Sequence, residues 1–327
     1  MSLAVLFLAA ALALQGTGPP PGPESRVVQM DAYLLLAVRA REAGQPDLAT
    51  QHMRRAWGLA ATDLDGMREL AKLALRRGLH DLVLRVHAAA IRTAPDDAVL
   101  RGTYGGALVR LHRYDAALPE LVAATAISPE DAEWWTWLAR ARLGLYQVDE
   151  AFAAYDRSVQ LDPDNLDTLV ARSEAELRTL RFADCEKTCL RILQLDPAHL
   201  GATSLLIRAR RRMGRQDEAL AAATEALARL GDRGEIRLER GRVYLESGDL
   251  EHAVEDLERA AELLPDSPVP YVHLIVAYTR LEMPEKAARA REKYEELEAR
   301  SATSPRPGGS GMEPPDPDPV TPDHPRK

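Results

Sequence analysis

The chain has 327 residues, a formal net charge of −8 and a pI near 5.6, and aromatic residues make up 5% of it. This acidic balance argues against a general nucleic-acid binder or a protein that covers anionic membranes, since both usually present a basic excess. The length suits two ordinary globular domains or one repeat array, and abundant alanine and leucine with few aromatics favour close helix packing over a sheet.

Residues 3–14 form an unbroken apolar run near the amino terminus. The run is too short to span a bilayer, which needs about 20 residues, but it suits the hydrophobic part of a secretory signal peptide. Ala11-Leu12-Ala13 offers a small-residue cleavage pattern. We therefore expect an exported protein, periplasmic or extracellular, with no transmembrane segment after signal removal. No Lys or Arg precedes Leu3, so an uncleaved apolar tail on a cytoplasmic protein is the alternative.

From Met30 onward the sequence repeats with a period of 34 residues and needs no insertion; the rows begin at Met30, Leu64, Ala98, Ala132, Leu166, Leu200, Gly234 and Pro268. Each row reads as two short amphipathic helices joined by a turn. The eighth and twentieth columns hold mostly small residues, which let two antiparallel helices approach closely. The thirty-second column is proline in five rows and ends the second helix there, at Pro95, Pro129, Pro163, Pro197 and Pro265.

A 34-residue helix-turn-helix unit with these columns resembles the tetratricopeptide repeat, and the match covers about residues 30–301. The resemblance implies an all-α fold, a right-handed α-solenoid superhelix of stacked antiparallel helix pairs, with the first helix of each pair lining a concave groove. Stacking is also expected from the residues themselves, because one unit of this length cannot bury its apolar face without neighbours. The largely charged residues 285–300 supply a soluble outer face for the last unit.

No constellation of residues indicates an active site, a cofactor site or a metal site, so we expect a protein that is not an enzyme. Cys185 and Cys189 lie four apart in one predicted helix, where a Cβ separation of about 5–6 Å exceeds the roughly 3.5–4.5 Å of a disulfide. We expect them to be small core residues, with a thiol or metal role as the alternative. Gly105 and Gly106 lie inside a predicted helix without a preceding strand, which excludes a phosphate loop.

Beyond Ser301 the composition changes to eight prolines and three glycines with no aromatic residue, which predicts a disordered tail. Its Pro-Asp-Pro-Asp-Pro segment is either a ligand for another domain or simply solvated. The expected segments are a signal peptide over 1–18, a Pro/Gly-rich linker with the start of the first helix over 19–29, eight repeats over 30–301 and the tail over 302–327.

Charges in the expected groove separate by column. In the family that the sequence resembles, the second, fifth, sixth, ninth, twelfth and thirteenth columns face the concave side. Here the ninth and thirteenth columns are mostly basic, with Lys72, Arg76, Arg110, Arg140, Arg178, Arg208, Arg212, Arg242 and Arg280. The second and sixth columns are mostly acidic, with Asp31, Asp65, Glu69, Glu133, Asp167, Glu235 and Glu239.

A basic stripe beside an acidic one would select an extended peptide with its own charge pattern, the arginines offering paired donors to carboxylates. The alternative is structural, because acids in the first turn and bases in the last turn offset the helix dipole. Pairs such as Glu69 with Lys72 and Glu239 with Arg242 are then i,i+3 neighbours worth about 0.2–0.5 kcal/mol each.

Trp137 falls in the sixth column, three residues before Arg140, so the resemblance puts both in the groove. Tryptophan and arginine are enriched among the residues that dominate interface energies. Packing between rows is the alternative for both. Trp135 falls in a packing column, while the exposure of Trp134 does not follow from the sequence. The predicted partner-binding residues are Trp137, Arg140, Lys72, Arg76, Arg110, Arg208, Arg212 and Arg242.

The sequence thus predicts a non-catalytic scaffold or adaptor that binds a peptide or protein partner, with no nucleic acid and no cofactor. The alternative is a self-associating structural or assembly component of the cell envelope. One subclass of the family that the chain resembles holds the carboxylate terminus of chaperones through asparagine and lysine at fixed groove columns. The sixth and ninth columns of consecutive rows contain no asparagine, so we do not expect that partner.

Overall fold

The computed structural model describes residues 23–61 and 63–303, and over these residues the chain forms 16 helices and no strand. They fall into two compact units, Met1–Ala171 and Arg172–Lys327, whose boundary lies inside α10. The expected signal peptide and all but the first two residues of the expected tail lie outside the described residues. The predicted fold class is confirmed, because the chain is a succession of antiparallel helix pairs.

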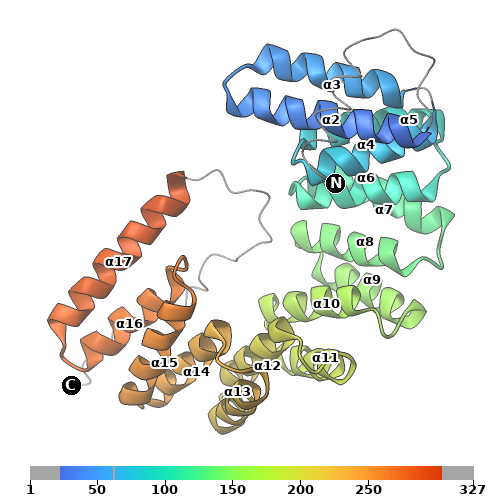
Figure 1. Cartoon of the computed structure of the whole chain (residues 1–327). Coiled ribbons are helices and arrows are strands. Elements are labelled where there is room, and N and C mark those ends of the chain that lie inside the picture. Colours follow the sequence, from blue (N-terminus) through green and yellow to red (C-terminus); the bar gives the residue numbers. More distant parts are fainter. Residues whose placement is uncertain (1–22, 62, 304–327) are drawn as a thin grey trace. The chain divides into compact units, whose positions relative to one another are not determined.

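The first unit contains four helix pairs that layer one on the next in chain order (Figure 1). Its helices are α2 (Pro23–Glu42), α3 (Pro46–Ala60), α4 (Leu64–Arg76), α5 (His80–Thr93), α6 (Ala98–Arg110), α7 (Tyr114–Ile127), α8 (Ala132–Gly144) and α9 (Val148–Leu161), followed by the start of α10 (Leu166–Arg178). The first helices also touch one another, as α2 does α4 and α6 does α8. Helix α2 begins about two turns before Met30.

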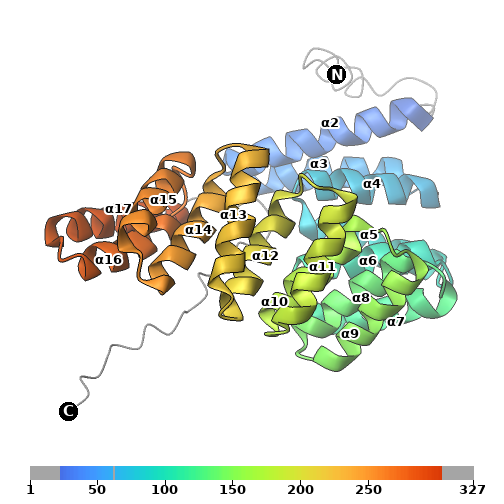
Figure 2. The same cartoon turned by 90° about the horizontal axis from the view of Figure 1, so that it is seen from below.

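The second unit continues with the same pairing, and Figure 2 shows its helices following one another from α12 to α17. Its helices are the end of α10, α11 (Phe182–Leu195), α12 (Leu200–Arg212), α13 (Gln216–Leu230), α14 (Gly234–Ser247), α15 (Leu250–Leu263), α16 (Val269–Arg280) and α17 (Pro284–Thr303). The helix that opens each pair starts at or within one residue of the row start in every pair after the first.

Small side chains lie where the two helices of a pair cross, as their columns predict. Ala139 and Ala151, from the eighth and twentieth columns, are both fully buried. At Gly105 a Cβ would come within 2.4 Å of Leu121 on the partner helix, and at Gly241 within 2.8 Å of Leu257. The two helices of a pair therefore pack with their backbones close together, and larger residues at these columns would prevent this close packing.

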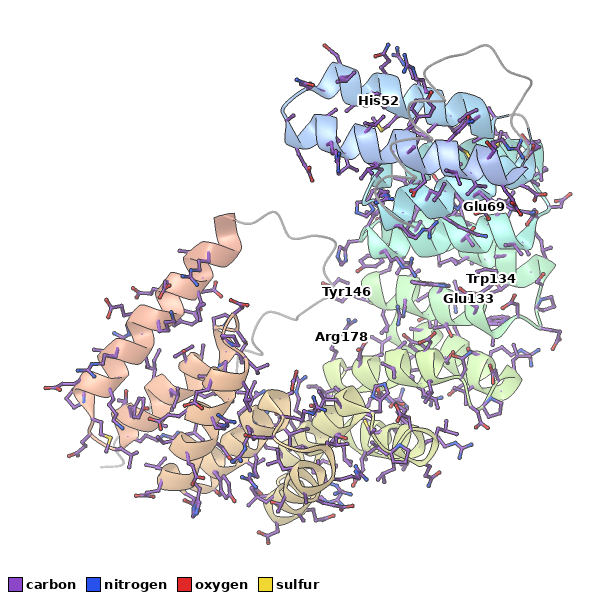
Figure 3. All side chains as sticks on the ribbon, in the orientation of Figure 1. His52, Glu69, Glu133, Trp134, Tyr146 and Arg178 are labelled. Atoms are coloured by element: carbon purple, nitrogen blue, oxygen red, sulfur yellow. The ribbon has the colours of Figure 1, made fainter. Side chains whose placement is uncertain are left out.

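The turn inside each pair contains one residue in the left-handed region, and these eight residues are spaced by 34. Their φ angles lie between 55° and 85°, at Gly44, Gly78, His112, Tyr146, Leu180, Gly214, Gly248 and Glu282. Glycine adopts this conformation without strain, whereas the four other residues hold it at a cost of about 1–2 kcal/mol each. Tyr146, labelled in Figure 3, is 90% exposed, so packing of its ring does not explain its place in the turn.

Candidate functional site

Two glycines in α6 shape the surface on which α8 packs. A Cβ at Gly102 would come within 2.2 Å of the Trp134 ring, and one at Gly106 within 3.1 Å of the Trp137 ring. Because the two glycines are about one turn apart, two tryptophans of α8 lie directly against the α6 backbone. Trp134 is 3% exposed and belongs to the core, whereas Trp137 is half-buried and keeps part of its ring at the surface.

Two arginines flank the exposed part of Trp137. The guanidinium carbon of Arg110 lies 4.9 Å from the centroid of the ring, and that of Arg140 lies 5.0 Å from it. Cation–π contacts at this distance contribute about 0.5–1 kcal/mol each at exposed sites. The indole Nε1 donates a hydrogen bond of 3.2 Å to Oε1 of Glu133, which fixes the ring's orientation. Figure 3 places Glu133 and Trp134 together on α8.

Arg110 and Arg140 form no ion pair with any other residue among those described, so their N–H donors remain available to a ligand. We refer to Arg110, Trp137 and Arg140, with Glu133 and Gly106 behind them, as the Trp137 site. It lies wholly within the first unit, on two helices that open their pairs. The structure therefore brings together three of the predicted groove residues.

Lys72 and Arg76, the other predicted groove residues of this unit, lie on α4. The Lys72 ammonium is 2.8 Å from the Glu69 carboxylate one turn earlier, which is the i,i+3 pair expected from the structural alternative. Its side chain is 69% exposed, so the pair is worth little in water. Arg76 is exposed in the last turn, where a cation offsets the helix dipole.

The predicted groove residues of the second unit are engaged inside the protein. The Glu239 carboxylate on α14 forms ion pairs with Arg242, at 3.3 Å, and with Arg208 of α12, at 3.9 Å. Arg242 is only 7% exposed, so its guanidinium belongs to the packing between helices. Arg212 lies 5.3 Å from the centroid of the Phe182 ring. These three arginines stabilise the unit, and they present less accessible charge than the Trp137 site does.

The buried titratable groups also serve packing. Glu176 on α10 is fully buried; burial raises its pKa, against the effect of Arg172 at 2.8 Å and of the Thr188 hydroxyl, which donates to it at 2.7 Å. Cys185 and Cys189 are free, fully buried thiols with their sulfurs 3.9 Å apart. The hydrogen bond between them, together with burial, raises the pKa of Cys189, so Cys189 is not a reactive thiolate.

In the part of the chain that the structure describes, no three His, Cys, Asp or Glu side chains come together in a way that could hold a metal ion. None of the helices over the same residues combines the length and apolar character that a membrane span needs.

Sequence comparison finds the tetratricopeptide repeat family at residues 105–165 and 205–268. Over 76 residues the chain is 37% identical to the Hsp70-Hsp90 organizing protein of Triticum aestivum, a match that covers 23% of this chain and 13% of the wheat protein. This chain therefore spans only a small part of that protein's length.

Solved structures with a similar fold cover more of the chain. A tetratricopeptide repeat protein from Parabacteroides merdae ATCC 43184 matches 76% of this chain and 98% of its own, with a TM-score of 0.53 and 13% identity. The Pseudomonas aeruginosa protein pilF matches 62% and 97%, with a TM-score of 0.50 and 17% identity. At such low identity both likenesses concern the fold.

Sequence reasoning missed the role of Gly106. It occupies the ninth column, which the row before it fills with Lys72 and the row after it with Arg140. A missing side chain in a column of long ones is a visible signal, and here it makes room for the ring of Trp137. Sequence reasoning also assigned packing to Trp135, which is in fact half-buried and donates through its Nε1 to the Pro129 carbonyl at 2.9 Å, whereas Trp134 is the buried one.

Proposed function

Since this chain is a tetratricopeptide repeat protein, we propose that it is a non-catalytic scaffold that binds an acidic peptide segment of a protein partner at the Trp137 site. The observation that supports this is a pair of arginines, without ion-pair partners among the residues that the structure describes, against one half-buried tryptophan. Elsewhere in the first unit, basic residues such as Arg77 and Arg101 are matched by acids at 2.8 and 2.6 Å.

The chemistry of the site fits a carboxylate beside an apolar side chain. Each guanidinium carries planar paired donors that match a carboxylate, and such charge-assisted hydrogen bonds are about twice as strong as neutral ones. The Trp137 ring offers apolar area for the neighbouring side chain of the peptide. Glu133 on the same helix repels an acidic ligand, but one carboxylate beside two guanidinium groups leaves the local charge positive.

The name of the wheat relative associates that protein with Hsp70 and Hsp90. For this chain we propose a different mode of recognition, because the asparagine and lysine pattern that holds chaperone carboxylate termini is missing from its groove columns. The recognised element is an internal acidic segment or a terminus that meets arginine and tryptophan instead.

The test is a capture experiment with the full chain as bait and lysate from its native cells as the source of partners, read by quantitative mass spectrometry. The double variant Arg110→Glu with Arg140→Glu should capture about tenfold less of the partner, because both guanidinium groups are replaced by carboxylates that repel the acidic peptide. The charge-matched control, Arg229→Glu with Arg291→Glu, changes exposed arginines on α13 and α17 and should retain it. Equal retention by both variants, with unchanged helicity, would refute the assignment.

We further propose export through the apolar run at residues 3–14. Amino-terminal sequencing of the protein isolated from its own cells tests this, and an intact Met1 would refute it. The self-associating alternative is separated by sedimentation: growth of multimers with concentration supports an assembly component, and a stable monomer supports the scaffold.

A further inference from the structure

A second basic surface lies between α3 and α5, the second helices of the first two pairs. Both helices pack on α4, and they border a groove of about 500 Å³. We call it the α3–α5 groove; its lining includes Met53, Arg54 and Trp57 from α3 and Leu82, Arg85 and Arg92 from α5. Since the Trp137 site is built on the first helices α6 and α8, the two sites share no residue.

The floor of the α3–α5 groove is apolar and its rim is basic. Met53 and Trp57 are half-buried against the core, and Leu82 is buried. All three arginines of the lining are exposed, and none of them forms an ion pair with another residue in the described part of the chain. Asp81 is the only acid in the lining, so the groove carries an excess of positive charge.

This positive charge is not a feature of the repeat. In α7 and α9, the next two second helices of the same unit, the columns that line the groove contain no Lys or Arg. Asp81, in contrast, occupies the eighteenth column, which is acidic in seven of the eight rows. That acid belongs to the first turn of the second helix, where it offsets the helix dipole. The arginines therefore gather here for a reason other than stacking of the repeat.

The second helices of the last two pairs, α15 and α17, border a groove whose charges are balanced from within. Glu258 stands there in the column that Arg54 occupies in the first row. Its carboxylate lies 3.7 Å from the Lys286 ammonium of α17 and accepts a hydrogen bond from the Tyr278 hydroxyl. The charged residues of that lining are two acids and two bases, namely Glu258, Glu262, Lys286 and Arg289. In the α3–α5 groove an arginine replaces the carboxylate, so a balancing acid has to come from a ligand.

We propose that the α3–α5 groove binds an acidic peptide segment of another protein, with carboxylates on its three arginines and an apolar side chain on its floor. Each guanidinium offers two donors to a carboxylate. Trp57 and Met53 supply the apolar area on which a side chain between the acids packs. The proposal does not rest on the Trp137 site, which lies on other helices of the same unit.

The spacing of the arginines favours a peptide over a small anion. Arg85 and Arg92 are seven residues apart on α5, which is about 10 Å along the helix axis, so one carboxylate cannot pair with both. An extended peptide advances about 3.3 Å per residue, so acids three residues apart reach both arginines while the residues between them meet the floor. The net charge of −8 disfavours a nucleic acid or an anionic membrane, because the rest of the chain repels a large polyanion.

The experiment uses the full chain carrying Arg110→Glu and Arg140→Glu, so that the Trp137 site takes no part in binding and the two proposals are tested separately. The probe is a fluorescein-labelled pool of synthetic peptides in which glutamates flank central positions occupied by Leu, Phe, Met or Val. Binding is read by fluorescence anisotropy at low salt, where electrostatic attraction is least screened. In this background, Arg54→Glu with Arg85→Glu should weaken binding by about tenfold. The matched control, Arg229→Glu with Arg291→Glu, should stay within about twofold, since α13 and α17 do not line the groove.

Two further pools test the chemistry of the ligand. A pool with serine at the central positions should bind about fivefold more weakly, because the apolar floor loses its contact. A pool with glutamine in place of glutamate should bind about tenfold more weakly, because the guanidinium groups lose their carboxylates.

The proposal is overturned if the glutamate pool does not bind the background chain, if the groove variant and the control lose binding alike, or if the serine pool binds as tightly as the apolar one. Tighter binding of phosphatidylglycerol vesicles or of a single-stranded DNA oligonucleotide, lost in the same groove variant, would give the groove to a lipid or a nucleic acid and also overturn it. Circular dichroism verifies folding, and Arg54→Gln with Arg85→Gln replaces the charge reversal if that variant loses helicity.

Discussion

The packing of Trp134 on Gly102 gives a sharp test of how α6 and α8 fit together. Gly102→Ala adds one methyl group whose ideal position lies 2.2–2.5 Å from three carbons of the Trp134 ring. Trp134 is 3% exposed, so the ring has little room to retreat. Overpacking of this kind costs about 1–3 kcal/mol.

A gain in helix propensity opposes this cost. Replacing glycine by alanine inside a helix stabilises it by about 1 kcal/mol. The net expectation for Gly102→Ala is therefore a loss of about 0–2 kcal/mol. Gly58→Ala in α3 is the matched control, because a Cβ there meets nothing within 4 Å and only the propensity gain applies. The difference between the two variants isolates the overpacking at about 1–3 kcal/mol.

Thermal unfolding followed by circular dichroism measures this difference. Gly58→Ala should raise Tm and Gly102→Ala should lower it or leave it unchanged, each kcal/mol corresponding to roughly 1.5 °C for a chain of this size. Trp134→Phe should cost less in the Gly102→Ala background than in the original chain, because the smaller ring relieves the clash. Equal stabilisation by both alanine substitutions would refute the packing of Trp134 on the α6 backbone.

The other predictions concern buried groups and turns. Burial raises the pKa of Glu176 in the folded chain, so the contribution of this carboxyl group to stability is full below its pKa in the unfolded chain and is lost as the pH rises through its pKa in the folded chain. The stability of Glu176→Gln relative to the original chain should therefore increase from pH 4 to pH 8. A difference that does not change with pH would contradict this. Ellman's reagent should detect no thiol in the folded chain and two after denaturation, since Cys185 and Cys189 are fully buried. Asp256→Asn should destabilise by about 2–4 kcal/mol in urea titrations, because two arginines lose their buried carboxylate. Leu180→Gly should raise Tm, since Leu180 is 64% exposed at a φ of 62°, and a lower Tm would show that its side chain stabilises the turn.

The architecture could be predicted because it repeats. Most rows carry small residues at the crossing columns and five of the eight carry a proline near the end, so the same local signal appears many times at a spacing of 34. Helix starts at Leu64, Ala98 and Ala132 therefore coincide with the predicted row starts. The left-handed position in the turn was harder to see, because only four of its eight residues are glycine.

The partners of individual charges were not predictable from the columns. Arg140 and Arg242 occupy the same ninth column, yet one lies against Trp137 and the other is buried beside Glu239. The difference depends on what the neighbouring first helix presents. In the first unit, Gly106 leaves space for the aromatic ring of Trp137 beside Arg140. In the second unit, Arg208 of the neighbouring first helix approaches the Glu239 carboxylate that also pairs with Arg242.

The sequence by itself determined the period, the helix pairs and the columns at which backbones approach, since these depend on residue size and on spacing along one chain. Only the tertiary structure decided which charges are accessible. Accessibility depends on side chains from neighbouring rows, and a substitution such as glycine for a long basic residue changes the surroundings of a residue 31 positions away, as at Gly106 and Trp137. The Trp137 site arises in this way, from side chains that different rows bring together.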